Sequence, residues 1–243
     1  MGGRRQKPVT WNRLLIDVCT QRDYLEPGAI LQVANRDKLL ANLRILFGWA
    51  TAIRVPVVSV IESHRPTEPI NGFPLHCIDG TPGQWKPSFT LLEPRILVET
   101  DNYLCLPPDL RKNYRQLLFR KRTRDVLSNP KADRFLTQLK AQEFIIVGVG
   151  AERAIKGLAL GLLARHKTVT VVSDACGYWS AADGDLAIRQ MVAKGIGAVK
   201  TSDLIAPLDR PAAPQKRLCR RSLAGRHHPH PTTNARKTRS KTP

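Results

Sequence analysis

Apolar and polar residues follow two different periods along this chain, and the two periods alternate. Short runs rich in β-branched residues predict strands that are buried on both faces. Between them, apolar residues recur at steps of three and four, which places them on one face of a helix. Strands that alternate with helices in this way form a parallel sheet with helices on both faces. The predicted strands cover residues 13–18, 55–61, 115–119, 144–147, 168–177 and 198–201, with a further short one at 96–98. The predicted helices cover residues 35–50, 132–140, 152–163 and 182–193.

One turn between a strand and a helix stands out as a candidate ligand site. The run Phe144–Val147 predicts a central strand, Gly148 and Gly150 allow a sharp turn, and the helical period begins at Glu152. The helix therefore starts at the carboxyl edge of the sheet, where open α/β sheets bind ligands. Its first turn has unpaired backbone N–H groups and the positive end of the helix dipole beside it.

Composition limits the class of protein. The 243 residues are 42% hydrophobic, which is enough for one sizeable core, and no apolar run is long enough to span a membrane. The basic N-terminus lacks the apolar segment of a signal peptide. An odd number of cysteines without C-x-x-C spacing indicates reduced thiols in a cytoplasmic protein. These are Cys19, Cys77, Cys105, Cys176 and Cys219.

Charge divides the chain into three parts. The net charge is +19, and residues 209–243 alone hold ten Lys and Arg against one Asp. This segment has almost no apolar residues, so we expect it to be disordered. We therefore expect a basic N-terminal extension at 1–12, one domain at 13–208 and a basic tail at 209–243. The tail either contacts nucleic acid or is solvated without a specific partner, and the charge run alone favours the second interpretation.

The turn after the central strand resembles a motif of a known family. Residues 148–155, Gly-Val-Gly-Ala-Glu-Arg-Ala-Ile, are similar to the G-V-x-T-D-x-C-V turn of the isochorismatase-like hydrolases, which include the nicotinamidases. Most members have their nucleophilic cysteine at the seventh position, where this chain has Ala154. A dinucleotide-binding G-x-G-x-x-G fingerprint is excluded, because Arg153 stands at the third glycine position.

The first strand ends in a second segment that resembles this family. Residues 17–28 are similar to its D-x-Q-x-D-F-x-x-P-G opening, and the resemblance implies that Asp17 is the catalytic acid or base. Cys19 stands where the family has Gln, and strand alternation would place Asp17 and Cys19 on the same face. Alternatively, Asp17 caps the turn that follows the strand.

Lys121 follows the third main strand in a context similar to the family's K-x-x-x-S/D-x-F, with Leu127 in place of the aromatic residue. The resemblance implies that Lys121 is the catalytic lysine. The alternative is a basic surface loop, since seven of residues 111–124 are Lys or Arg. The position directly after a strand favours the catalytic role.

Candidate metal ligands follow the second strand. Glu62 and His64 fall on the family's D-x-H, and His76 begins a segment similar to its H-C-x-x-G-T-P-G. Two histidines and a carboxylate suit a divalent ion such as Zn, Mn or Fe. The chain departs from the family in having Glu for Asp, and no fourth ligand is evident. The alternative is that all three are polar residues at loop ends.

The resemblance covers residues 13–205 and implies a three-layer α/β/α Rossmann-like sandwich with a six-stranded parallel sheet. It implies a small-molecule ligand, a homo-oligomer and a triad of Asp, Lys and Cys, of which the cysteine is missing at Ala154. It also implies that backbone N–H groups at Gly150 and Ala151 hold an oxyanion. An alanine cannot form an acyl intermediate, so the usual amide hydrolysis is excluded. Three interpretations follow: acid–base hydrolysis by Asp17 and Lys121, a catalytically silent homologue, or a displaced nucleophile at Cys19.

Overall fold

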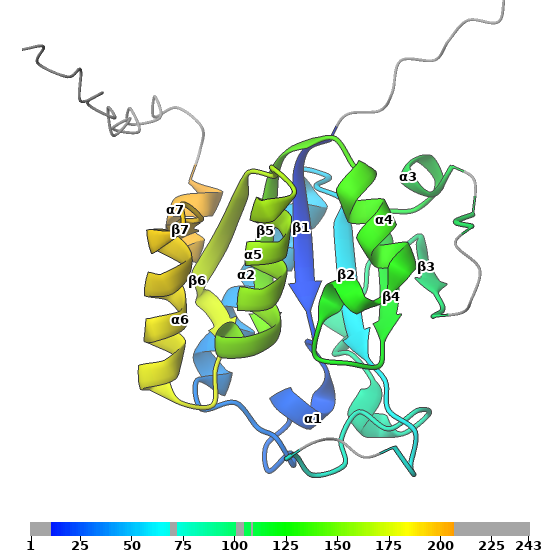
Figure 1. The fold of residues 1–243 in the computed structure, drawn as a ribbon, viewed down its shortest axis with the longest axis vertical. Coiled ribbons are helices and arrows are strands. Elements are labelled where there is room, and N and C mark those ends of the chain that lie inside the picture. The colour runs from blue at the N-terminus through cyan, green and yellow to red at the C-terminus, as the bar shows by residue number, and fades with distance from the viewer. Residues whose placement is uncertain (1–10, 69–71, 101–104, 108, 207–243) are drawn as a thin grey trace, which may run out of the picture. The chain divides into compact units, whose positions relative to one another are not determined.

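The computed structural model of the protein describes residues 11–68, 72–100, 105–107 and 109–206 (Figure 1). The basic tail expected at 209–243 lies outside the described residues, as does the N-terminal extension except for Trp11 and Asn12, which belong to the first strand. None of the helices in the described part of the chain is long and apolar enough to cross a membrane.

A single parallel sheet organises the described residues (Figure 1). Its strand order is β3-β4-β2-β1-β5-β6-β7, so it has seven strands where six were expected. The additional strand is β3, which pairs in parallel with β4 at one edge of the sheet. Three of its four residues are not fully buried, which explains why its apolar run was a weak signal. The strands are β1 (Trp11–Val18), β2 (Val57–Glu62), β3 (Arg95–Val98), β4 (Gln116–Lys121), β5 (Ala141–Val149), β6 (Val169–Gly177) and β7 (Gly197–Val199).

Helices cover both faces of the sheet, which confirms the three-layer α/β/α sandwich. Figure 1 shows α4, α5 and α6 in front of the strands, and α2 and α7 behind them. The α-helices are α1 (Arg22–Leu25), α2 (Arg36–Ala52), α3 (Leu110–Asn113), α4 (Pro130–Gln138), α5 (Lys156–Ala164), α6 (Ala181–Ala193) and α7 (Thr201–Ile205). Three short 3₁₀ turns are η1 (Pro82–Gln84), η2 (Ser88–Thr90) and η3 (Val126–Ser128), and a π-helical turn, η4 (Ala151–Ile155), precedes α5.

The core forms where the sequence pattern places it. The central strands β1 and β5 are buried on both faces, as continuous apolar runs predict. Helix α2 packs its apolar stripe on the sheet, and Leu39, Leu43 and Leu46 are fully buried. Burial of each such side chain contributes roughly 1.5–3 kcal/mol. Helix α4 begins where the side chain of Asn129 accepts hydrogen bonds from the backbone N–H groups of Lys131 and Ala132.

The topology places a ligand site between β1 and β5. The chain moves outward from β1 on one side through β2, and from β5 on the other side through β6, so the strand order reverses between the two central strands. Open α/β sheets bind ligands beyond the carboxyl ends of the strands at this point. The two strands approach closely there: a Cβ on Gly148 would lie 2.1 Å from the carbonyl oxygen of Val18. Only glycine fits, because Gly148 also has a φ of +121°.

Candidate active site

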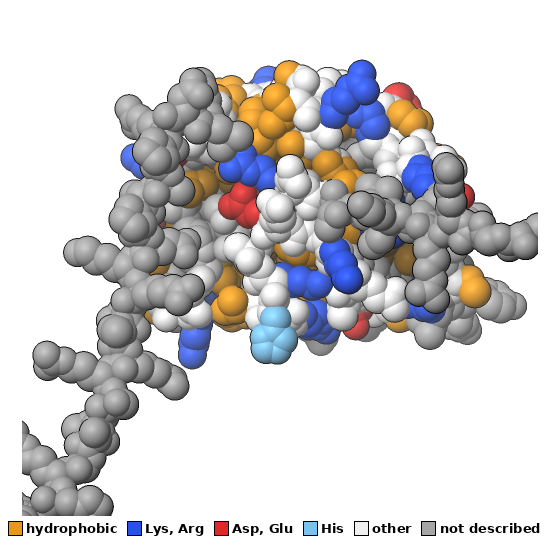
Figure 2. Space-filling model, turned by 90° about the horizontal axis from the view of Figure 1, so that it is seen from above, with side chains coloured by type: hydrophobic (Ala, Val, Ile, Leu, Met, Phe, Trp, Pro, Cys, Tyr) orange, Lys and Arg blue, Asp and Glu red, His pale blue; other side chains and the backbone are white. Residues whose placement is uncertain are grey.

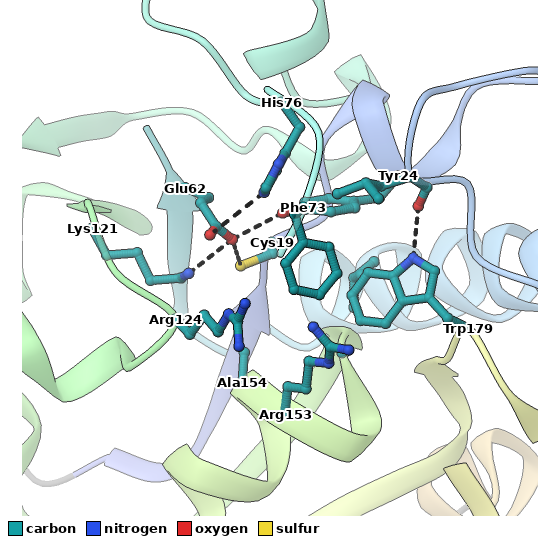
Figure 3. A pocket seen from close by; sticks show the side chains of 13 residues that line it. Cys19, Tyr24, Glu62, Phe73, His76, Lys121, Arg124, Arg153, Ala154 and Trp179 are labelled. Atoms are coloured by element: carbon teal, nitrogen blue, oxygen red, sulfur yellow. Dashed lines mark hydrogen bonds and ion pairs between the residues drawn. The ribbon is translucent and has the colours of Figure 1, made fainter. Parts of the chain in front are cut away.

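Side chains from several strand ends enclose a cavity of about 40 Å³ at the carboxyl edge of the sheet (Figure 3). Glu62, the last residue of β2, lies in it with only 6% of its surface exposed. The residues that line the cavity are Cys19, Tyr24, Leu31, Glu62, Phe73, His76, Lys121, Arg124, Val149, Gly150, Arg153, Ala154 and Trp179.

One oxygen of the Glu62 carboxylate is held by three hydrogen-bond donors. Its Oε2 lies 2.9 Å from Nζ of Lys121 and accepts hydrogen bonds from the Tyr24 hydroxyl at 2.9 Å and the Cys19 thiol at 3.6 Å. Sheet register brings the ion pair together, because Glu62 and Lys121 are Cα partners in β2 and β4. Figure 3 shows these side chains converging from different elements.

The Glu62–Lys121 pair is ionised. Burial alone would raise the pKa of Glu62, but Lys121 and the histidine hydrogen bonds hold it well below its ordinary value. Burial alone would lower the pKa of Lys121, but the ionised Glu62 carboxylate raises it. Lys121 is therefore an ammonium group at neutral pH, and it can donate hydrogen bonds but cannot act as a base.

The other oxygen of Glu62 faces two histidines. Its Oε1 lies 3.0 Å from Nε2 of His64 and 3.8 Å from Nε2 of His76. The ligand atoms of the three residues all lie within 4.8 Å of one another, and all three residues are buried. Within the ranges that the structure describes, this is the only cluster of three potential metal ligands, and it contains no fourth His, Cys, Asp or Glu.

This group fits a divalent metal ion. Nδ1 of His76 lies 2.8 Å from the carbonyl oxygen of Pro74, which fixes the ring and leaves Nε2 as the ligand atom. Oε2 of Glu62 is anchored by its own donors, which leaves Oε1 for an ion. Catalytic zinc sites commonly use three protein ligands and keep one position open. Glu62, His64 and His76 are therefore chemically able to hold such an ion.

Asp17 occupies a different place from the one expected. It is fully buried and is not among the residues that line the cavity. Its Oδ2 forms a 2.5 Å ion pair with Lys86 and accepts hydrogen bonds from Ser59 at 2.8 Å and Thr20 at 3.0 Å. Asp17, to which the resemblance assigns the role of catalytic acid or base, therefore lies apart from the cavity that Lys121 and Ala154 line. Strand alternation ends at Val18, since Cys19 has a φ of +51° and turns its side chain into the cavity instead.

Cys19 takes the place beside Lys121 that the resemblance had given to an acid. Burial raises the pKa of Cys19 to about 12, against the lowering effect of Lys121. The group is therefore a neutral thiol at physiological pH. A thiol is a far weaker nucleophile than a thiolate, which argues against a displaced nucleophile at Cys19.

The remaining predicted positions lie on the turn after β5. Gly150 has a φ of +87° and precedes the π-helical turn η4, which contains Ala154. Gly150 and Ala154 line the cavity together with Lys121. Ala151 is buried beside them and does not line it. The position that carries a nucleophile in most relatives thus presents a methyl group to the cavity.

Aromatic side chains that no sequence motif had indicated form one wall of the cavity. The ring centroid of Tyr24 lies 5.9 Å from that of Trp179 and 5.6 Å from that of His76, and the centroid of Phe73 lies 6.5 Å from that of Trp179. Tyr24 and Trp179 each follow soon after a strand end, a position that could have marked them. Lys86 had no such signal, because it is brought to Asp17 by a loop.

The loop that carries Trp179 is tied to the segment before α2. The indole Nε1 of Trp179 donates a hydrogen bond to the carbonyl oxygen of Leu31 at 2.9 Å. The backbone N–H of Ala34 donates to the carbonyl oxygen of Tyr178 at 2.8 Å. The side chain of Asn35, the residue before α2, makes no capping hydrogen bond to the helix and accepts one from the backbone N–H of Tyr178 at 3.2 Å. These bonds fix the wall against the body of the domain.

A parallel α/β/α sandwich with a polar pocket and a metal-type ligand set at its carboxyl edge defines the class of protein. The family model of the isochorismatase domain matches residues 14–203, and the chain belongs to this family. Among curated protein sequences, none matches this chain.

Solved structures show the same fold. A pyrazinamidase of Pyrococcus horikoshii in complex with zinc is 21% identical over 78% of this chain and 99% of its own, with a TM-score of 0.60. An isochorismatase-like hydrolase of Alkaliphilus metalliredigens is 16% identical over 80% and 97%, with a TM-score of 0.64. The MAR1 ribonuclease of Caenorhabditis elegans is 18% identical over 80% and 79%, with a TM-score of 0.54. At these identities the likeness concerns the fold.

Proposed function

We propose that this protein hydrolyses a small planar amide or ester with the help of a divalent metal ion and without a covalent acyl intermediate. One observation carries the proposal. The cavity joins a buried Glu62–His64–His76 ligand set to the charged Lys121, yet position 154 offers no nucleophile. Two of the solved neighbours, the pyrazinamidase and the isochorismatase-like hydrolase, are hydrolases by name.

Each group has a role in this proposal. A divalent ion bound by Glu62, His64 and His76 would polarise a carbonyl group and lower the pKa of a water molecule. The ammonium group of Lys121 would stabilise negative charge as it develops on the carbonyl oxygen. Tyr24 and Trp179 would hold the planar part of the substrate against the aromatic wall. Pre-positioned groups of this kind lower the barrier without forming a bond to the substrate.

Asp17 does not take part in the proposed reaction. A general acid or base must come within hydrogen-bond distance of the proton that it transfers. The Asp17 carboxylate is instead bound to Lys86, Ser59 and Thr20 behind the cavity. Its proposed role is structural, since it joins the end of β1 to β2 and to the loop that carries Lys86.

A second candidate is a homologue that binds a ligand without turning it over. The observation in its favour is that two positions of the pocket, Cys19 and Ala154, hold a neutral thiol and a methyl group. In this case the metal-type residues and the aromatic wall would serve recognition alone.

Metal analysis and turnover assays separate the two candidates. The purified chain is loaded with Zn or Mn, its metal content is measured, and pyrazinamide, nicotinamide and phenyl acetate are tested as substrates. We expect metal-dependent turnover that His76→Ala abolishes and that the exposed control His166→Ala leaves unchanged, with no acyl adduct in the intact mass. Ligand and metal binding without turnover would favour the second candidate. Failure to bind metal would refute the proposal.

A further inference from the structure

We propose that the pocket selects ligands that carry a negatively charged group, a carboxylate or a phosphate, and that Arg153 and Arg124 bind this group at its mouth. This inference rests on the proposed function for the chemistry of the site and adds the charge of the ligand. It concerns recognition, so it can be tested by binding alone.

Arg153 is the first observation. Its guanidinium carbon lies 4.2 Å from the ring centroid of Phe73 and 5.4 Å from that of Trp179. Within the described residues, its side chain makes no hydrogen bond and no ion pair. Stacking orients the planar group and leaves its five N–H donors at the edge, where they are available to an anion. The side chain is exposed, yet it lines the cavity.

A second guanidinium meets the same ring. Arg124, from the loop after β4, lies 4.5 Å from the centroid of Phe73 (Figure 3). Figure 3 shows the side chains of Arg124 and Arg153 reaching toward Phe73 from the side of the cavity that holds Ala154. Both guanidinium groups lie against the same ring, so an anionic group beside Phe73 is close to both. Arginine pairs bind carboxylate and phosphate groups through short, charge-assisted hydrogen bonds.

The charged side chains that line the cavity also favour an anionic ligand. Lys121, Arg124 and Arg153 face a single lining carboxylate, Glu62, which is already paired with Lys121. A divalent ion on Glu62, His64 and His76 would add further positive charge. Arg153 has no ion-pair partner among the described residues, so a neutral ligand would leave its charge unpaired at the cavity.

The size of the cavity places the anion near the arginines. Its volume of about 40 Å³ holds only a few water molecules, at about 10–15 Å³ each. The inner part therefore accepts the reacting group, while the rest of the ligand lies at the mouth. That is where Phe73, Arg124 and Arg153 meet. Figure 2, which views the described domain from another side, shows Lys and Arg side chains scattered over it, so surface charge alone does not distinguish this mouth.

The test compares nearly isosteric probes of different charge. Binding of benzoate, neutral benzamide, phenyl phosphate and inorganic phosphate is measured by calorimetry on the metal-loaded full chain. We expect benzoate or phenyl phosphate to bind at least about tenfold more tightly than benzamide, and Arg153→Gln to reduce this preference about tenfold. Arg44→Gln is the matched control, because Arg44 stacks on Phe89 at 4.7 Å outside the cavity and should leave the preference unchanged.

The outcomes separate the sources of the anion and the two proposals. If phenyl phosphate and inorganic phosphate bind more tightly than benzoate, the ligand carries a phosphate. If benzoate binds more tightly than both, the ligand carries a carboxylate. Equal binding of benzoate and benzamide, a preference that survives Arg153→Gln, or no binding of any probe would overturn the inference. A charge preference that persists in the absence of turnover would refute only the proposed hydrolysis. Thermal melts of Arg153→Gln and Arg44→Gln confirm that both variants are folded.

Discussion

Lys121 and Glu62 face each other across β4 and β2 as register partners, and their side chains form a 2.9 Å ion pair from which water is almost excluded. Removal of one partner leaves a buried charge without compensation. We expect Lys121→Met to lower the free energy of unfolding by about 3–5 kcal/mol. Chemical denaturation measures this loss.

The control for Lys121→Met is the same substitution in an exposed pair. Lys112 lies 2.9 Å from Asp109, and about half of each side chain is exposed. Lys112→Met should cost less than about 1 kcal/mol. Equal losses for the two variants would show that the Glu62–Lys121 pair is solvated.

Introducing a cysteine at position 154 tests whether the turn can still activate a nucleophile. The first turn of a helix lowers the pKa of a thiol, and this support comes from the backbone. We expect the new thiol of Ala154→Cys to react with iodoacetamide near pH 7 faster than the exposed Cys105, as read by peptide mass spectrometry. Burial raises the pKa of Cys19 and of Cys176 to about 12 each and raises that of Cys77 further, so these three thiols should label most slowly. A thiol at 154 that labels no faster than Cys105 would contradict this expectation.

Asp79 makes stability depend on acid pH. Partial burial alone would raise its pKa, but hydrogen bonds from Ser63, Gln84 and Arg122 lower it below the ordinary value. A carboxyl group with a lowered folded-state pKa stabilises the fold above its unfolded pKa of about 3.9, and this stability is lost as the pH falls through the folded value. Asp79→Asn should therefore reduce stability at pH 7 and flatten its decline below about pH 4.

Denaturation midpoints measured from pH 7 down to pH 3 check this dependence. The exposed Asp185→Asn is the control, and its curve should follow that of the wild type. If Asp79→Asn and the wild type lose stability in parallel below pH 4, the hydrogen bonds around Asp79 do not stabilise its ionised form.

Two glycines give opposite predictions for one substitution. At Gly148 a Cβ would meet the carbonyl oxygen of Val18 at 2.1 Å, and φ is +121°, so Gly148→Ala should destabilise by at least about 2 kcal/mol. At Gly157, on α5, a Cβ would meet nothing within 4 Å. Gly157→Ala should therefore stabilise by about 0.5–1 kcal/mol. Urea unfolding of both variants measures the contrast, and a neutral Gly148→Ala would mean that β1 and β5 can move apart.

Deletion of residues 209–243 tests the role of the basic tail. The family match ends at residue 203 and the last described helix ends at Ile205, so the deletion should change Tm by less than about 2 °C. A fall of about 10 °C or more would mean that the tail packs on the domain. Salt-sensitive RNA or DNA binding that disappears with the deletion would support a nucleic-acid contact.

The sequence predicted the layers of the fold because they depend on patterns within single segments. Buried runs and helical periods identified β1, β5, α2 and α6 to within a few residues. The edge strand β3 was not counted in the sheet, since most of its side chains are partly exposed and little apolar pattern remains. Such a strand forms because it pairs with β4, and this pairing cannot be predicted from the residues of the strand itself.

Within the site, residues on regular strands were easier to place than residues on turns. Lys121 and Ala154 lie on the cavity because a strand end and a helix start fixed their direction. Asp17 and Cys19 were expected on the same face, but only Cys19 lines the cavity, because its left-handed backbone ends the strand alternation. The Asp17–Lys86 pair joins positions far apart in the chain, and no local pattern records such a partnership.

The hydrogen bonds that join Trp179 and Tyr178 to Leu31, Ala34 and Asn35 have a consequence for ligand selection. They fix the position of the Trp179 side of the pocket relative to the segment that leads into α2. Phe73 extends this wall, and its ring is held by contacts with Trp179 and His76 and by the guanidinium groups of Arg124 and Arg153. Stacking contacts of this kind rearrange more readily than paired backbone bonds. Any plasticity toward ligands of different width should therefore come from Phe73 and its two arginines, while Trp179 sets a fixed limit.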